Sequence, residues 1–120
     1  MTARVYAPAT RDLLSAWHAA GGVPADAERV LADGDDEDSE YAALMTAADL
    51  ATDPTTDLGP ADGRRVVVVA ETTGSGDGEL PLRTWVAVHA DVADRTADAD
   101  PDDDLGWFGV QEIPDLLRAP

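Results

Sequence analysis

The 120-residue sequence contains no cysteine, no lysine and no asparagine, and only 5% of it is aromatic. Without cysteine, the chain has no disulfide, thiolate metal site or cysteine nucleophile. Without lysine, it lacks the side chain that a P-loop directs at a phosphate. No apolar run approaches the roughly 20 residues of a membrane-spanning helix, and the first residues lack the basic and apolar segments of a signal peptide. We therefore expect a cytoplasmic protein.

The length predicts a single domain spanning residues 1–120. A chain of this size buries roughly 65% of the surface of its unfolded state, which is enough for one modest core. The apolar share of 44% is close to that of ordinary globular proteins.

Positive charge is scarce, because 25 acidic residues face only 8 basic ones and the formal net charge is −17. Three explanations remain open: the codon usage of a G+C-rich genome, adaptation to high salt, and imitation of a nucleic-acid surface. All three oppose direct binding to nucleic acid or anionic lipid, which requires a basic patch. We expect no nucleic-acid partner and no membrane partner.

The first half of the chain predicts one strand followed by three helices. The strand covers residues 4–7, and Thr10 is placed to cap a helix over residues 11–20 that two glycines end. Pro24 is suited to the first turn of a short helix that ends near residue 34. The acidic run 33–40 then precedes a long helix over residues 36–51, where its charge complements the helix dipole.

The second half predicts three strands, over residues 66–69, 84–90 and 105–113. The first two are apolar on both faces, which is typical of strands in the interior of a sheet. Because helices separate the first strand from the valine strand, we expect a right-handed parallel crossover between them. The predicted fold class is α+β: a two-layer sandwich with a mixed, mainly antiparallel sheet of about four strands and two or three helices on one face.

A glycine-rich loop, TTGSGDGEL, follows the valine strand and resembles the start of a phosphate-binding site. A phosphate loop requires a helix behind its glycines, whereas here strand-like sequence continues after Pro81. Asp77 and Glu79 would also repel a phosphate. The segment from Gly74 to Gly78 therefore predicts a mobile hairpin tip without a ligand role.

Candidate metal and catalytic groups are few. Read as an EF-hand loop, the run beginning at Asp98 has Asp103 at the position that requires glycine and Gly109 at the position that requires glutamate. The acidic run 33–40 fails at the same two positions, so we expect no metal and no cofactor. His18 and His89 are the only histidines. A structural role is predicted for both, with His89 on a strand face that it shares with Trp85.

Five short motifs occur in an order that resembles a small uncharacterised family of actinobacterial proteins: RVYAPAT, DDEDSEYAAL, RRVVVVAE, WVAVHADV and LGWFGVQEIPDLL. The resemblance spans nearly the whole chain and implies a shared fold and a bacterial cytosolic setting. It implies no activity and no catalytic residue. The sequence departs from the family pattern at residues 91–104, where a helix is expected, and at Phe108, where tyrosine is usual.

Three hypotheses follow for function. The favoured one is a non-catalytic accessory or interaction domain that binds a protein partner or forms a dimer. The alternatives are an acidic decoy that imitates nucleic acid and a small enzyme with a pocket on the sheet near His89. The residues predicted for that pocket are Arg4, Tyr6, Trp85, His89, Trp107 and Glu112.

Overall fold

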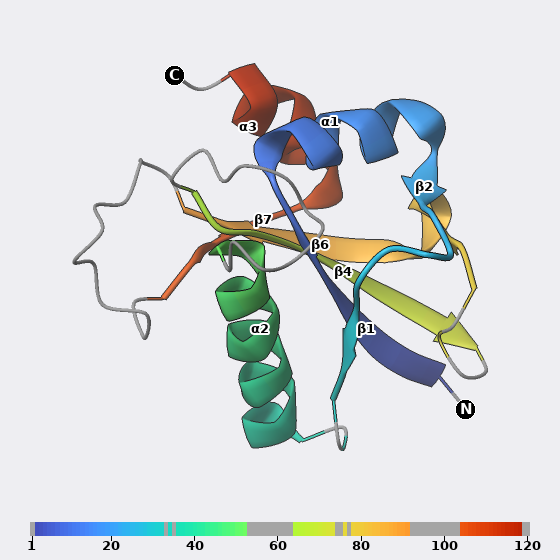
Figure 1. Ribbon diagram of the computed structural model, residues 1–120, viewed down its shortest axis with the longest axis vertical. Helices are drawn as coiled ribbons and strands as arrows, with labels where there is room; N and C mark the ends of the chain where they lie inside the picture. The colour runs from blue at the N-terminus through green and yellow to red at the C-terminus, as the bar shows by residue number, and fades with distance from the viewer. Residues whose placement is uncertain are drawn as a thin grey trace.

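A computed structural model of the chain describes residues 2–32, 34, 36–52, 64–73, 76, 78–91 and 104–118 (Figure 1). The elements in chain order are β1 (Thr2–Ala9), α1 (Arg11–Ala20), β2 (Gly22–Val23), β3 (Val30–Leu31), α2 (Glu37–Thr52), β4 (Val66–Thr73), β5 (Leu80–Pro81), the 3-10 turn η1 (Leu82–Thr84), β6 (Trp85–Ala90), β7 (Gly106–Phe108), the 3-10 turn η2 (Val110–Glu112) and α3 (Ile113–Arg118).

The centre of the fold is a five-stranded sheet in the order β3-β1-β4-β6-β7, beside a small two-stranded sheet of β2 and β5. Every strand pairing between described residues is antiparallel. The predicted α+β class with a mainly antiparallel sheet is therefore confirmed. The valine strand β4 is the central strand, as its continuous apolar run indicates.

The predicted parallel crossover between the first strand and the valine strand is wrong, because β1 and β4 pair antiparallel from Thr2 opposite Thr73 to Ala9 opposite Val66. The reason lies in the connection between them. Strand β3 carries the chain back along β1, and α2 then returns it, so that β4 begins beside the end of β1. Strands β1 and β4 therefore run in opposite directions.

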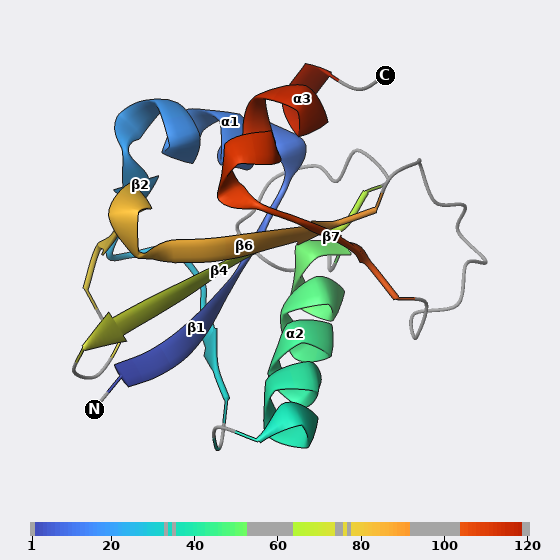
Figure 2. The same cartoon turned by 180° about the vertical axis from the view of Figure 1, so that it is seen from behind.

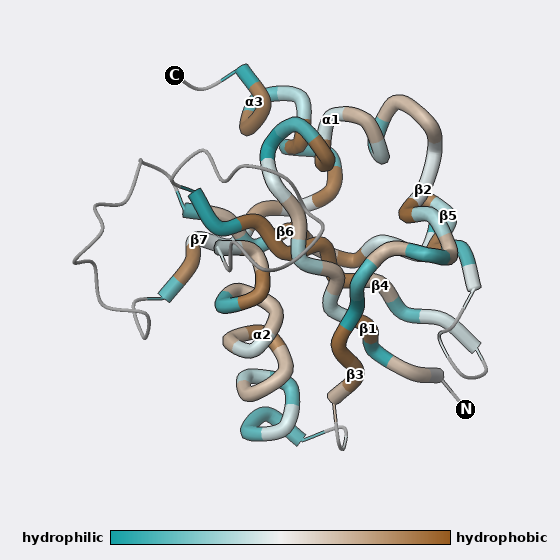
Figure 3. Tube along the Cα trace, viewed as in Figure 1, coloured by the Kyte–Doolittle hydropathy of each residue, from teal (hydrophilic) through white to brown (hydrophobic). Residues whose placement is uncertain are grey.

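Helices cover both faces of the sheet, so the expectation of helices on one face is also wrong. Helices α1 and α3 pack on one face and α2 on the other, as the two opposite views show (Figures 1 and 2). The apolar stretch of β4 supplies both cores and lies between the helices (Figure 3). A central strand without polar alternation requires cover on each face, because an exposed row of valines would remain hydrated.

Helix α1 has the predicted bounds and caps. The Thr10 hydroxyl accepts a hydrogen bond from the backbone N–H of Leu13 at 3.1 Å, which satisfies one of the free donors at the helix start. Gly21 ends the helix with φ +90°, and its N–H donates to the carbonyl of Trp17 at 2.9 Å. Local signals alone therefore define this helix.

The helix predicted after Pro24 does not form. A turn and strand β3 occupy this segment instead, and Val30 and Leu31 pair with Tyr6 and Val5 of β1. The apolar residues whose spacing suggests a short helix belong to an edge strand instead. This two-residue strand forms because its backbone pairs with β1, a distant partner that cannot be identified from the local sequence.

Gly22 of β2 sits against the backbone of β5, and we expect Gly22→Ala to lower the melting temperature by roughly 5–10 °C. A Cβ at this position would lie 2.8 Å from the carbonyl oxygen of Leu80 and 3.1 Å from the Cα of Pro81. Both are backbone atoms, so the small sheet must shift. The matched control is Gly78→Ala, since a Cβ there meets nothing within 4 Å. Equal melting of both variants in calorimetry would contradict the close approach.

Candidate functional site

Four of the six predicted pocket residues lie on the face of the sheet that α2 partly covers. Arg4 and Tyr6 come from β1, His89 from β6 and Trp107 from β7. Val67 of the α2-side core is opposite His89, which in turn is opposite Trp107, so these side chains share that face. From strand spacing and rise, Tyr6 and His89 are roughly 12 Å apart along the sheet. The four residues therefore form two separate pairs.

Trp85 lies on the opposite face from His89, which corrects the prediction that the two share a face. The β4–β6 register shifts between Val69 and Ala70, and Val86 is the extra residue that this bulge inserts. Trp85 consequently packs in the core beneath α1 and α3, where its indole N–H donates to the carbonyl of Leu80 at 3.0 Å. Its role is structural.

Glu112 has a capping role away from the sheet face. Its carboxylate accepts a hydrogen bond from the backbone N–H of Gly109 at 3.0 Å, at the start of η2. This contact closes the turn that leads into α3. The structure therefore does not bring Glu112 to His89, and the six predicted residues do not converge in one pocket.

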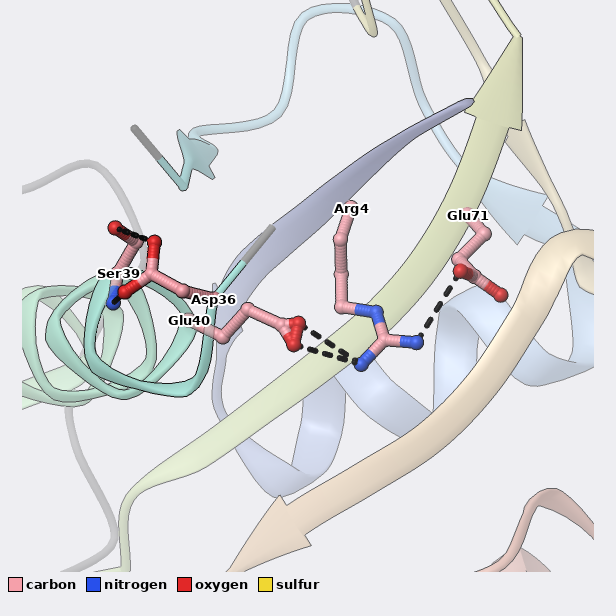
Figure 4. A network of polar contacts seen from close by, with 5 residues as sticks. All are labelled: Arg4, Asp36, Ser39, Glu40 and Glu71. Atoms are coloured by element: carbon pink, nitrogen blue, oxygen red, sulfur yellow. Dashed lines mark hydrogen bonds and ion pairs between the residues drawn. The ribbon is translucent and has the colours of Figure 1, made fainter. Parts of the chain in front are cut away.

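Arg4 joins three elements through its guanidinium group (Figure 4). One terminal nitrogen lies 3.3 Å from a carboxylate oxygen of Glu40 on α2, and the other lies 3.1 Å from a carboxylate oxygen of Glu71 on β4. Nearby, Ser39 donates from its backbone N–H and its hydroxyl to the carboxylate of Asp36 at the start of α2, and these bonds lower the pKa of Asp36. The acidic run 33–40 thus contributes a helix cap through Asp36 and, through Glu40, an ion pair between α2 and β1.

Tyr6 lies beside Arg4 and is 4% exposed. Burial, together with the negative charge of Glu40, raises the pKa of its phenol. The ring packs with Val67 and Val69 under α2. A neutral, buried phenol in an apolar cluster is a packing residue.

His89 is half-buried on β6, and burial lowers the pKa of its imidazole. Among the described residues, no carboxylate forms a hydrogen bond or ion pair with its ring. A general base in a triad-like arrangement requires a third group to orient it. The described residues opposite His89 on the neighbouring strands are Val67 and Trp107, and neither can orient the imidazole as a carboxylate would.

Trp107 is the exposed member of the three tryptophans. It is 63% exposed on the edge strand β7, whereas Trp17 and Trp85 are 6% and 5% exposed. Phe108, the next residue, turns to the other face and packs against the core of α1 and α3. The alternation of the strand thus directs one aromatic ring inward and leaves its neighbour at the surface.

A second exposed aromatic residue, on helix α2, is bonded to the segment just before β7. Tyr41 of α2 is 50% exposed, and its hydroxyl donates to a carboxylate oxygen of Asp104 at 2.9 Å. Asp104 lies two residues before Gly106, the first residue of β7. This bond ties α2 to the start of the strand that presents Trp107.

A model of a family of unknown function, DUF6912, matches residues 3–117. The chain belongs to this family. The match confirms the resemblance to an uncharacterised family, and it covers both the β1 and the α3 segments that the sequence motifs identify. No curated protein and no solved structure matches the chain.

In this DUF6912 chain, Arg29 is a structural residue that sequence reasoning missed. Its guanidinium donates to four backbone carbonyls: Ala27 at 3.2 Å, Pro24 at 2.8 Å, Gly76 at 2.8 Å and Gly78 at 2.6 Å. These bonds hold the β2–β3 turn to the segment after β4. These four bonds form the Arg29 clamp. The sequence around Arg29, between Glu28 and Val30, gives no indication that the side chain bonds to distant carbonyls.

The glycine-rich loop is confirmed as part of an antiparallel β4–β6 connection, and the first element described after it is the strand β5. The prediction of a free tip is wrong at Gly76, which is buried with φ +78°. A Cβ there would lie 3.0 Å from a methyl group of Val5, and its carbonyl bonds to Arg29. Gly76 is therefore needed for close packing against Val5.

Two further predictions concern the acidic runs and the membrane. The EF-hand-like positions Asp98, Asp100 and Asp102 lie outside the described residues, as do positions 92–103 of the departure at residues 91–104. Among the residues that the structure describes, no helix is long and apolar enough to cross a bilayer.

Proposed function

We propose that this protein is a non-catalytic interaction domain of the bacterial cytosol, of actinobacterial origin, that binds a protein partner through Trp107. The observation that carries the proposal is the 63% exposure of this indole on an edge strand, when the other two tryptophans are buried. Tryptophan is among the residues most enriched at the energetic centres of protein interfaces. A large exposed ring on a rigid strand needs little reordering on binding.

The roles of four of the described carboxylates favour this function over an acidic decoy. Glu40 and Glu71 pair with Arg4, Asp91 pairs with Arg65, and Glu112 caps a turn. A decoy needs rows of free carboxylates at phosphate-like spacing on a rigid surface. These side chains hold the fold together instead.

Capture from extracts of the native organism tests the proposal. The wild-type protein, Trp107→Ala and the control Val86→Ala, a 38% exposed residue of β6, are immobilised in equal amounts. We expect at least one protein to bind the wild type and the control and to be depleted about thirtyfold on Trp107→Ala, as for a hot spot of about 2 kcal/mol. Quantitative mass spectrometry measures the depletion.

Both variants must melt like the wild type, which the exposure of both side chains leads us to expect. Identical protein sets on all three surfaces would contradict a binding role for Trp107.

A further inference from the structure

Charge around Trp107 restricts the partners that this surface can accept. The chain carries a net charge of −17. Asp104, bonded to Tyr41, precedes the strand itself. An approaching segment with negative charge would be repelled, and one with positive charge would be attracted over about 8–10 Å at ordinary ionic strength.

Four of the arginines are already engaged by groups within the fold. Arg4 pairs with Glu40 and Glu71, Arg65 with Asp91, and Arg118 with Asp115, while Arg29 bonds to carbonyls. These four cations are therefore held by internal partners. Next to Trp107, burial lowers the pKa of the His89 ring, which favours its neutral form. The described neighbour of the indole on β6 thus adds no positive charge that would compete for its face.

We propose that the Trp107 surface binds an arginine-rich segment of a protein partner, with a guanidinium group stacked on the indole. The inference rests on the proposed function and names the partner class. Tryptophan is the ring that attracts cations most strongly over its face. The guanidinium is planar and weakly hydrated, so it stacks on an aromatic ring better than an ammonium group does.

A second copy of this chain is a poorer occupant of the same surface. Two chains of charge −17 repel each other, and this repulsion is strongest at low salt. The edge strand that presents Trp107 is also only three residues long, from Gly106 to Phe108, which limits pairing between two copies.

The test uses three capped peptides of equal length, in which glycine alternates with arginine, lysine or glutamine. Calorimetry at 0.15 M NaCl gives the dissociation constant of each peptide for the wild type, Trp107→Leu and Val86→Ala. We expect the wild type to bind the arginine peptide several-fold more tightly than the lysine peptide, and the glutamine peptide not measurably. Trp107→Leu should weaken arginine-peptide binding about three- to thirtyfold and remove the preference over lysine, whereas Val86→Ala should change neither.

Three results would overturn the inference. Unchanged arginine-peptide affinity in Trp107→Leu would mean that the net charge alone binds the peptide. Equal affinity of the wild type for arginine and lysine peptides would exclude stacking. A concentration-dependent dimer in sedimentation that Trp107→Leu abolishes would make a second copy the occupant.

Failure of this inference and failure of the proposed function give different results. If extract capture still depends on Trp107 while the peptides show no arginine preference, the interaction role holds and only the partner class is wrong. If capture is the same with and without Trp107, the proposed function itself fails.

Discussion

Val67→Asp is expected to abolish folding of the protein. Val67 is fully buried on the central strand β4 and packs in the core between the sheet and α2. A carboxylate at this position would lose its hydration without gaining a cation among its described neighbours, and the cost of several kcal/mol rivals the total stability of a small domain. Circular dichroism should show loss of the cooperative thermal transition.

The matched control places the same charge on the same strand at an exposed position. Thr73→Asp lies at the end of β4, where the side chain reaches water, and should melt within about 2 °C of the wild type. A folded Val67→Asp protein with an unchanged transition would show that α2 does not seal this face of the sheet.

Asp91→Ala is expected to lower the free energy of unfolding by about 3–5 kcal/mol, which corresponds to a fall in melting temperature of roughly 10–20 °C. The Arg65 side chain is 2% exposed, and its guanidinium lies 2.9 Å from the Asp91 carboxylate. The same carboxylate accepts the backbone N–H of Arg65 at 2.8 Å, and the Asp91 N–H donates back to the Arg65 carbonyl at 3.0 Å. Removing the carboxylate takes this ion pair and the bond to the Arg65 backbone away from a buried guanidinium.

An exposed ion pair of the same chemistry provides the comparison. Arg118 and Asp115 form a pair on α3 in which both side chains are more than 70% exposed, so Asp115→Ala should change stability by less than about 1 kcal/mol. Denaturant melts of both variants measure the difference. The double replacement Arg65→Met with Asp91→Leu should recover much of the loss, because apolar side chains of similar volume need no counter-charge. Equal losses of unfolding free energy in Asp91→Ala and Asp115→Ala would mean that the buried pair stabilises the fold no more than the exposed pair does.

Elements with strong local signals were predictable from the sequence. The bounds of α1 follow from a capping threonine and a terminal glycine, and β4 and β6 follow from apolar runs bounded by turn formers. Helix α2 begins within one residue of its predicted start, because the acidic residues before it cap the helix and complement its dipole. These signals act over a few residues and depend little on the rest of the chain.

Features that depend on distant partners were not predictable in this way. Strand β3 has two residues and exists because Val30 and Leu31 find backbone partners on β1. The clamp of Arg29 and the buried pair of Arg65 with Asp91 each join residues that are more than 20 positions apart. In a chain with many charged residues, the local sequence does not indicate which of them become buried.

The tryptophans show which properties follow from the sequence and which depend on the tertiary structure. The sequence by itself determined the composition of the chain, its acidity, its α+β class with a mainly antiparallel sheet and the central place of the valine strand, because these follow from local propensity and hydrophobic pattern. Only the tertiary structure decided that Trp85 is buried and Trp107 exposed, although both occupy strands with similar neighbours. A single extra residue, Val86, turns Trp85 to the helix-covered core, whereas Trp107 lies on an edge strand at the surface. The direction of a side chain on a sheet depends on register and on strand order, and both are set by contacts between residues far apart in the chain.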